Sequence, residues 1–530
     1  MSEADGIARR GWATRRRPRR TLSSVPYLRG LDGMRALAVI AVMVYHANSS
    51  WLPGGFIGVE VFFVISGYLI TLLLIGEHER SGRVSLRQFY ARRARRLLPA
   101  LFMMLALVTV YTALFKREEL GRLRGDVLAA LAYVSNWFQI WVGQGYTAEG
   151  QFAPLRHLWS LAVEEQFYLV WPIVMIALIR AGKGRLPSYS RWLLLAAIAV
   201  SVAVGLVFEP TRAIDPAATP DAFWDVGGHA INKTETLYLS TITRSTGLLV
   251  GGALALLWRP VAVMRGPLRD KGATLDGLAL VGIGSLVVLA WRLHIVTDEG
   301  PDPLLFRGGF LAVDLAAMLM IAAVSHRRSL TGRLLGMPIL LWIGTRSYGM
   351  YLFHWPIFQM MRGVAGTPLD VRQFTVAMLA TAFVTELSYR LFEMPIRRRR
   401  IRPILVRLGH RAGPIGRRAI GFGMAGSVVL VGFASASMVT AELEPNDIER
   451  SLQQGESAVV DLAASPRPAS PGLAVTTEPV PTTAIVDTTE VVDTTEVVDT
   501  TTTALAVATT TTASTTTATT TPVAPPNALS

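Results

Sequence analysis

The stretch MRALAVIAVMVYHA, residues 34–47, is apolar enough to enter a lipid bilayer, yet it keeps two ionisable side chains, Arg35 and His46. Ionisable residues inside a bilayer are costly and almost always face the interior of a helix bundle or a water-filled cavity. Eleven residues separate the two, which is about three helical turns and puts them within roughly 20° of one helical face. The spacing predicts a membrane helix that turns one polar face inward.

Two plainer interpretations of this helix stay open. Arg35 can be an arginine whose long side chain snorkels to the inner membrane interface. His46 can be a histidine at the outer interface. Asp32 lies three residues before Arg35 and is placed to pair with it.

The composition supports a membrane protein. Of the 530 residues, 51% are hydrophobic and 17% are charged, whereas soluble domains average about 25% charged residues. The net charge of +14 is concentrated in residues 1–30 and 393–418, as expected of cytoplasmic segments under the positive-inside rule rather than of nucleic-acid binding. The chain has no cysteine, which excludes disulfides, thiolate catalysis and cysteine-based metal sites.

The apolar segments predict the fold class. A helix needs about 20 apolar residues to cross the hydrocarbon core, and eleven segments qualify: 34–50, 56–75, 97–115, 155–179, 191–207, 238–258, 276–293, 308–325, 338–360, 372–392 and 419–440. A twelfth, 127–142, is shorter and more polar, and we interpret it as re-entrant or interfacial. We expect an all-α polytopic membrane protein with a bundle of about ten transmembrane helices, an additional C-terminal transmembrane helix and a disordered tail.

The charges of the loops predict the orientation. Segments 76–96, 180–190, 259–275, 326–337 and 393–418 are all basic, whereas 208–236 and 294–307 are mixed or acidic. The positive-inside rule therefore places the N-terminus and the basic loops in the cytoplasm, with 127–142 not counted as a full crossing.

Five regions follow from this topology. Residues 1–26 form a basic disordered cytoplasmic arm with no evident cleavable signal, 27–400 the membrane domain, 401–418 a basic cytoplasmic linker and 419–440 the last transmembrane helix. Residues 441–530 are rich in Thr and Pro and contain the repeat VVDTTEVVDTTEVVDTT. Such a composition does not bury enough apolar surface to fold, so we expect a disordered extracytoplasmic tail, either a glycosylated stalk or unmodified.

Two further motifs carry charge. GGFIGVEVFFVISGYLIT, residues 54–71, has Glu60 at the start of a span, and FYARRARRLLPA, residues 89–100, holds an arginine cluster that includes Arg92, Arg93 and Arg96. Guanidinium groups suit phosphate binding because each donates bidentate hydrogen bonds. Ordinary positive-inside charge or contact with anionic lipids is the alternative.

HLWSLAVEEQFYLVWP, residues 157–172, places His157 and Glu164 seven residues apart on one helical face, with Glu165 beside them. Carboxylates inside a span suggest function; a hydrogen-bonded cap at the helix start is the alternative.

TRSYGMYLFHWP, residues 345–356, places Tyr351 and His354 on one face, and Arg244 begins another span on the outer side. Glu386, Arg390 and Glu393 share a face at four- and three-residue spacing, which more often forms a structural ion-pair network.

These pieces, in this order from about Tyr27 to Pro395, resemble the acyltransferase-3 family of integral membrane O-acyltransferases. The resemblance implies transfer of a short acyl group, often acetyl, from acyl-CoA to a hydroxyl of an extracytoplasmic glycan, glycolipid or similar acceptor. It implies that Arg35 and His46 form the catalytic Arg-x10-His motif and that Arg93 and Arg96 contact the phosphates of acyl-CoA. Many relatives carry a fused esterase-like domain after the last span, and the tail here is too low in complexity to supply one.

The expected mechanism follows from the resemblance. Acyl-CoA docks from the cytoplasm near Arg92, Arg93 and Arg96, and His46 either takes the proton of the acceptor hydroxyl or receives the acyl group. Arg35 lies nearer the donor, and Glu164 is the candidate to hold the other nitrogen of His46. The remaining candidates for the substrate pocket are Asp32, Glu60, His157, Glu165, Tyr351, His354 and Arg244.

We expect no metal and no bound cofactor, and the expected partners are acyl-CoA, a glycan or lipid-linked acceptor and the lipid bilayer, without nucleic acid. A polytopic small-molecule transporter is the alternative function, since intramembrane charges also mark transport paths. A membrane anchor for a glycosylated stalk is a third.

Overall fold

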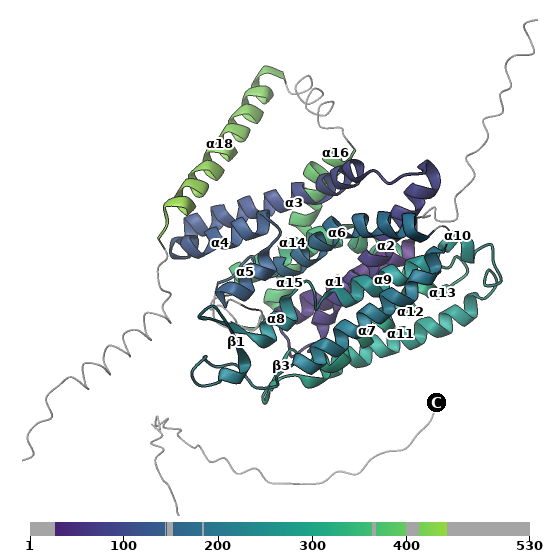
Figure 1. The fold of residues 1–530 in the computed structure, drawn as a ribbon. Helices are drawn as coiled ribbons and strands as arrows, with labels where there is room; N and C mark the ends of the chain where they lie inside the picture. Colours follow the sequence, from purple (N-terminus) through teal and green to yellow (C-terminus); the bar gives the residue numbers. More distant parts are fainter. Residues whose placement is uncertain are drawn as a thin grey trace, which may run out of the picture. The chain divides into compact units, whose positions relative to one another are not determined.

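The computed structural model describes residues 27–143, 145, 152–182, 185–362, 367–398 and 413–442. The predicted arm, 1–26, most of the linker predicted at 401–418 and nearly all of the predicted tail lie outside the described residues. Within the described part the chain is mostly helical (Figure 1).

Seven helices are long and apolar enough to cross a membrane in the part of the chain that the structure describes. The seven are α1 (Arg29–Ala47), α2 (Gly58–Ser81), α3 (Leu86–Phe115), α6 (Leu158–Gly182), α7 (Ser190–Val207), α11 (Gly272–Arg292) and α12 (Phe310–Val324). Three of them, α2, α7 and α12, are extended at their start by a short helical turn. Three further predicted spans are also continuous helices: α14 (Pro338–Met361), α15 (Val371–Ser388) and α18 (Gly413–Thr440).

The segment predicted as one span over 238–258 is broken. Its first part belongs to α8 (Lys233–Leu239) and its second to α9 (Ser245–Leu257), with Arg244 between them. The segment 127–142 forms the end of α4 (Leu120–Leu131) and α5 (Ser135–Val142), separated by Tyr133 at a φ of 54°. At 1.5 Å per residue these two helices are about 18 and 12 Å long, too short to cross a core of about 30 Å.

The connections hold short elements only. Two antiparallel hairpins join β1 (Phe223–Val226) to β2 (His229–Asn232) and β3 (Val296–Thr297) to β4 (Gly300–Pro301). The remaining helical turns are η2 (Gly55–Ile57), η3 (Arg117–Glu119), η4 (Leu186–Tyr189), η5 (Pro220–Ala222), α10 (Pro260–Val263), η6 (Leu305–Gly309), α13 (Leu330–Leu334), η7 (Tyr389–Glu393) and α16 (Met394–Arg397).

The two ends of the bundle match the charge pattern of the loops. Figure 1 shows β1 and β3, which belong to the predicted outside loops, at one end of the helices, and α10 and α13, from the basic loops, at the other. The two kinds of loop lie at opposite ends because antiparallel helices joined by short connections place successive loops at alternate ends of the bundle.

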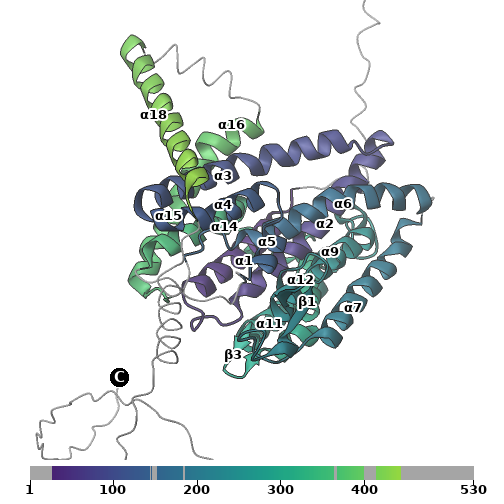
Figure 2. The same ribbon diagram turned by 60° about the vertical axis from the view of Figure 1, so that its left-hand side comes forward.

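α2 is the most buried of the candidate spans and α9 lies against it in both views (Figure 2). The contact needs glycine, because a Cβ on Gly67 would overlap the carbonyl oxygen of Leu248 and a Cβ on Gly251 that of Val64. Small residues at such positions let two membrane helices approach closely enough for their backbones to pack.

The helices α7, α11 and α15 differ from α2 in that they expose large apolar side chains. Leu206 of α7, Leu280 of α11 and Phe383 of α15 are 81%, 70% and 69% exposed, respectively, and further large apolar side chains lie beside them on the same helices. Apolar surfaces of this extent are stable only when they are covered. Together with the long apolar helices, they make this a multi-pass membrane protein whose outer ring faces lipid.

Candidate active site

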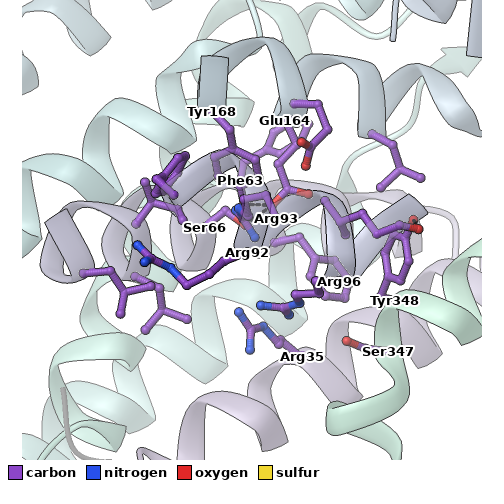
Figure 3. A pocket seen from close by; sticks show the side chains of 18 of the residues that line it. Arg35, Phe63, Ser66, Arg92, Arg93, Arg96, Glu164, Tyr168, Ser347 and Tyr348 are labelled. Atoms are coloured by element: carbon purple, nitrogen blue, oxygen red, sulfur yellow. Dashed lines mark hydrogen bonds between the residues drawn. The ribbon is translucent and has the colours of Figure 1, made fainter. Parts of the chain in front are cut away.

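A cavity of about 700 Å³ lies among α1, α2, α3, α6 and α14. Figure 3 shows the guanidinium groups of Arg35 and Arg96 close together in it, with Arg92, Glu164 and Tyr168 among the other side chains of the lining. Its polar lining consists of Arg35, Ser66, Glu77, Arg80, Ser81, Gln88, Arg92, Arg93, Arg96, Ser160, Glu164, Glu165, Tyr168, Ser347, Tyr348 and Tyr351. The stretches that stood out in the sequence therefore meet in one space.

The arginines enter this cavity from two helices. α3 begins with a cap in which the Ser85 side chain accepts a hydrogen bond from the backbone nitrogen of Gln88. Further along α3, Arg96 lies three residues after Arg93 and four after Arg92, so it can share a helical face with each, and all three side chains line the cavity. Two of the cavity arginines are paired with carboxylates: Arg92 with Glu77 at 2.7 Å and Arg35 with Asp32 at 3.2 Å. The predicted pairing of Arg35 with Asp32 is confirmed, and Asp32 itself does not line the cavity.

Arg93 differs from its neighbours. Its Nε and Nη2 atoms are buried and have no hydrogen-bond partner among the described residues. Its guanidinium carbon lies 3.5 Å from the centre of the Tyr168 ring. Buried donors without partners are rare because losing water without compensation is costly. Arg93 is therefore positioned to bind an anion that enters the cavity.

Glu164 forms the wall beside Arg93. One of its carboxylate oxygens accepts hydrogen bonds from the hydroxyl groups of Ser66 and Tyr168. The contact expected between Glu164 and His46 is therefore wrong: Nδ1 of His46 lies against His354 instead. The physical reason is distance along the chain, since Glu164 lies seven residues, about 10 Å of helix, after His157, whose ring adjoins that of His354 in the histidine cluster.

Three histidines form a buried cluster beyond the cavity. Nδ1 of His46 in α1 lies 2.8 Å from Nε2 of His354 in α14, and their ring planes differ by 6°. The ring of His157, just before α6, lies 5.8 Å from that of His354. All three side chains are buried. α1 and α14 can bring His46 and His354 together because glycine at position 344 lets its helix pack against the Asp32 carbonyl.

Pro356 explains where His157 binds. A proline lacks the backbone N–H that would bond the carbonyl four residues earlier in a helix, and here that carbonyl belongs to Leu352. Nε2 of His157 lies 3.1 Å from the Leu352 oxygen and takes the vacant position. The proline in the sequence HWP predicts a free carbonyl four residues earlier. The residue that binds this carbonyl, His157, comes from a distant segment and is decided by the tertiary structure.

Tyr351 and Ser160 separate the cavity from the histidine cluster. Their hydroxyl oxygens lie 2.6 Å apart, and both residues line the cavity. The Tyr351 hydroxyl also donates to the carbonyl oxygen of His157, and its ring lies 5.4 Å from that of His354. Of the predicted pocket residues, Tyr351 and Glu165 line the cavity, while His157 and His354 belong to the adjoining cluster.

Glu60 and Arg244 lie elsewhere. They form an ion pair in which both side chains are 1% exposed, and neither lines the cavity. The break before α9 places Arg244 against α2, where its guanidinium carbon lies 4.0 Å from the Phe310 ring centre and 4.9 Å from that of Tyr238. The substrate-pocket role expected for Glu60 and Arg244 is thus replaced by a buried structural pair.

The ion-pair network expected at Glu386 is present in a different form. Glu386 accepts hydrogen bonds from Arg390 and also from Arg346 of α14. Glu393 is the last residue of the π turn Tyr389–Glu393, and it is buried beside the Ser388 hydroxyl. The π turn changes the helical phase, so the four- and three-residue spacing no longer shares one face.

Comparison with known proteins identifies the family of the chain. The family described as an acyltransferase domain matches residues 28–389. The O-acetyltransferase OatA of Staphylococcus aureus is 38% identical over 375 residues, which are 70% of this chain and 58% of that relative. The peptidoglycan O-acetyltransferase OatA of Listeria monocytogenes is 38% identical over 382 residues, which are 72% of this chain and 57% of that relative.

The chain thus spans less than two thirds of the length of these relatives. No solved structure matches it significantly. The family match covers the helices that build the cavity and both of its adjoining histidine-bearing helices, α1 and α14. The chain therefore belongs to the acyltransferase-3 family.

Proposed function

We propose that this protein moves an acetyl group from acetyl-CoA, bound from the cytoplasm, to a hydroxyl of a cell-envelope glycan, with peptidoglycan as the acceptor class to test first. The names of the relatives, O-acetyltransferase and peptidoglycan O-acetyltransferase, support the acetyl group and the acceptor class. The donor is proposed from the chemistry of the cavity.

The observation that carries the proposal is the course of the cavity. It begins among arginines, of which Arg93 has buried donors without partners, and extends to the Ser160–Tyr351 pair that contacts the histidine cluster. Its volume of about 700 Å³ falls within the range of about 300–1,000 Å³ typical of small-molecule sites. A donor with phosphates at one end and a thioester at the other fits a space that is lined by arginines and also by Ser160 and Tyr351, which contact the histidine cluster.

The charges of the lining residues favour binding of an anion in the cavity. Five arginines and three glutamates line the cavity, namely Arg35, Arg80, Arg92, Arg93, Arg96, Glu77, Glu164 and Glu165. The excess of positive charge favours an anion, and planar guanidinium groups bind phosphate oxygens bidentately. In this role Arg93 and Arg96 hold the phosphates of the donor, Arg92 stays paired with Glu77, and Arg35 lies at the floor of the same space.

The chemical step uses His46 as general base. His46 takes the proton of the acceptor hydroxyl as the oxygen attacks the thioester carbonyl carbon. The new C–O bond forms, the C–S bond breaks, and the sulfur leaves as a thiolate that recovers the proton from His46. The products are the O-acetyl glycan and CoA, so no further reactant is needed.

The position of His46 suits an acceptor from the outer side. His46 is one residue from the end of α1, about 16 Å along the helix from Arg35. In the orientation that the basic loops predict, this end faces outward. Donor and acceptor then approach the same buried cluster from opposite sides of the membrane.

The test measures transfer of a radiolabelled acetyl group from acetyl-CoA in membranes that contain the full chain and a peptidoglycan acceptor. We expect label in the glycan fraction with the wild type, and its loss with His46→Gln and Arg93→Ala. Arg95→Ala is the matched control, because Arg95 lies in the same basic run, does not line the cavity and donates to its own helix at Ala91. Equal labelling by wild type, His46→Gln and Arg93→Ala would overturn the proposal, and uptake of a solute without acetylation would favour a transporter.

A further inference from the structure

The reacting nitrogen of His46 follows from a chain of hydrogen bonds that starts on α14. Nδ1 of His354 lies 2.6 Å from the carbonyl oxygen of Tyr351 and 3.2 Å from that of Met350. Carbonyl oxygens only accept hydrogen bonds. Nδ1 of His354 must therefore carry a hydrogen and donate it.

The other nitrogen of His354 is then assigned. Among the described residues, no carboxylate forms an ion pair with His354, and a charged group buried without such a partner is strongly disfavoured. His354 is thus the neutral ring with Nδ1–H, and its Nε2 keeps a lone pair. That lone pair faces Nδ1 of His46 at 2.8 Å.

We propose that His354 is a positioning residue that holds His46 in the Nδ1–H tautomer, so that Nε2 of His46 is the nitrogen that takes the proton of the acceptor hydroxyl. Because Nε2 of His354 only accepts, Nδ1 of His46 donates, and the lone pair of His46 is on Nε2. The near-coplanar rings, at 6°, give the hydrogen bond good alignment. This inference rests on the proposed function for its catalytic meaning but not for the tautomer itself.

The same contact stabilises His46 after it takes the proton. The cationic ring of His46 donates a charge-assisted hydrogen bond to His354, which is shorter and stronger than the neutral one. His354 can accept it without turning, because Nδ1 stays anchored on the Tyr351 and Met350 carbonyls. The role resembles that of a group that holds a catalytic imidazole from behind, with a neutral ring in place of a carboxylate.

His157 does not perform this role, although it belongs to the same cluster. Its Nε2 donates to the Leu352 carbonyl, and its Nδ1 is buried and has no hydrogen-bond partner in the part of the chain that the structure describes. Its ring stands at 78° to that of His354. The geometry separates the two histidines: one directs a lone pair at Nδ1 of His46 and the other is fixed to the backbone of α14.

The tautomer is read by nitrogen NMR. The full chain, which has eight histidines, is labelled with ¹⁵N-histidine, and the His46 signals are identified by their absence in His46→Gln. We expect the wild type to show a protonated Nδ1 and an unprotonated Nε2 on His46. A protonated Nε2 with an unprotonated Nδ1 in the wild type would overturn the inference without any variant of His354.

Two variants then test the role of His354. His354→Phe keeps an aromatic ring but removes the acceptor, so the tautomer preference should be lost and acetyl transfer should fall at least about 100-fold, since a positioned general base contributes on the order of 100- to 10,000-fold. His354→Gln restores an acceptor oxygen and should recover the tautomer and transfer to within about tenfold of the wild type. His326→Gln is the control for loss of a buried histidine, because His326 is 3% exposed and lies in the loop after α12.

The outcomes separate the two proposals. If His354→Phe folds, as judged by an unchanged thermal transition, and keeps both the tautomer and the transfer rate, the positioning role is wrong. If the wild type shows the Nδ1–H tautomer but no acetyl transfer to any glycan, the proposed function is wrong while the assignment of the tautomer stands.

Discussion

The guanidinium group of Arg93 stacks over the ring of Tyr168, with 3.5 Å between its central carbon and the ring centre. The hydroxyl of the same tyrosine donates to Glu164. Tyr168 thus contacts both the guanidinium group of Arg93 and the carboxylate of Glu164, and this arrangement makes Arg93 difficult to replace even by another cation.

Arg93→Lys should weaken donor binding. Lysine keeps the charge but loses the planar fork and the stacking on Tyr168, and a cation–π contact is worth about 0.5–2 kcal/mol. Each 1.4 kcal/mol is tenfold in affinity, so we expect KM for acetyl-CoA to rise about tenfold with a smaller change in kcat. Arg95→Lys should leave both constants unchanged, and an unchanged KM in Arg93→Lys would remove Arg93 from the donor site.

Glu60 and Arg244 should behave as a buried charge pair. Both side chains also interact with the buried carboxylate of Asp314, and removing one partner from a buried charge pair costs about 3–5 kcal/mol. Glu60→Ala should therefore lower the thermal transition of the detergent-solubilised protein strongly, and adding Arg244→Ala should cost less than the sum of the two single changes.

The exposed pair of Arg269 and Asp270 provides the comparison, since its side chains are 65% and 51% exposed. Asp270→Ala should leave the transition unchanged, because water and salt screen such pairs. Strict additivity of Glu60→Ala and Arg244→Ala would show that the two side chains do not interact.

Gly67→Ala should disrupt the contact between α2 and α9. The added methyl group would overlap the Leu248 carbonyl, and overpacking of this kind costs about 1–3 kcal/mol or more. Gly277→Ala in α11 is the matched change, because a Cβ there meets nothing within 4 Å. We expect it to be neutral or slightly stabilising, since glycine costs roughly 0.5–1 kcal/mol relative to alanine inside a helix. Equal thermal transitions for the two variants would argue against the close approach.

Pro356→Ala should stabilise the helix and slow the enzyme. Alanine supplies the missing N–H, which would compete with His157 for the Leu352 carbonyl. We expect a higher thermal transition together with a lower rate of acetyl transfer. Pro338→Ala is the control, because Pro338 occupies the first turn of α14, where proline is tolerated. A Pro356→Ala protein with a full transfer rate would show that the His157 contact is dispensable.

The orientation can be tested with single cysteines, because the chain has none of its own. Ala230→Cys lies in the β1–β2 hairpin and Arg265→Cys in the basic connection after α10, and both positions are exposed. In intact cells a membrane-impermeant thiol reagent should label the first and not the second, and permeabilised cells should label both. Labelling of Arg265→Cys in intact cells would reverse the predicted topology.

Much of the site could be predicted because its residues are anomalous in their local context. Arg35, His46, Glu164 and the arginines of α3 stand out against apolar helices, and the cost of burying them points to function. His354 stood out less, as a single histidine three residues from Tyr351. Its importance comes from a contact with a residue 308 positions away in the chain, and no local pattern encodes such a contact.

The sequence by itself determined the membrane class, the positions of most helices, their predicted orientation and the family, because hydropathy, loop charge and motif spacing are local properties. Tertiary structure alone decided which polar residues meet. It placed Nδ1 of His46 against His354 rather than Glu164 and brought Glu60 and Arg244 together as a buried pair. It also left Nε and Nη2 of Arg93 without a hydrogen-bond partner among the described residues. The physical reason is that each buried polar group must find a partner across helices, and the packing of distant segments selects that partner.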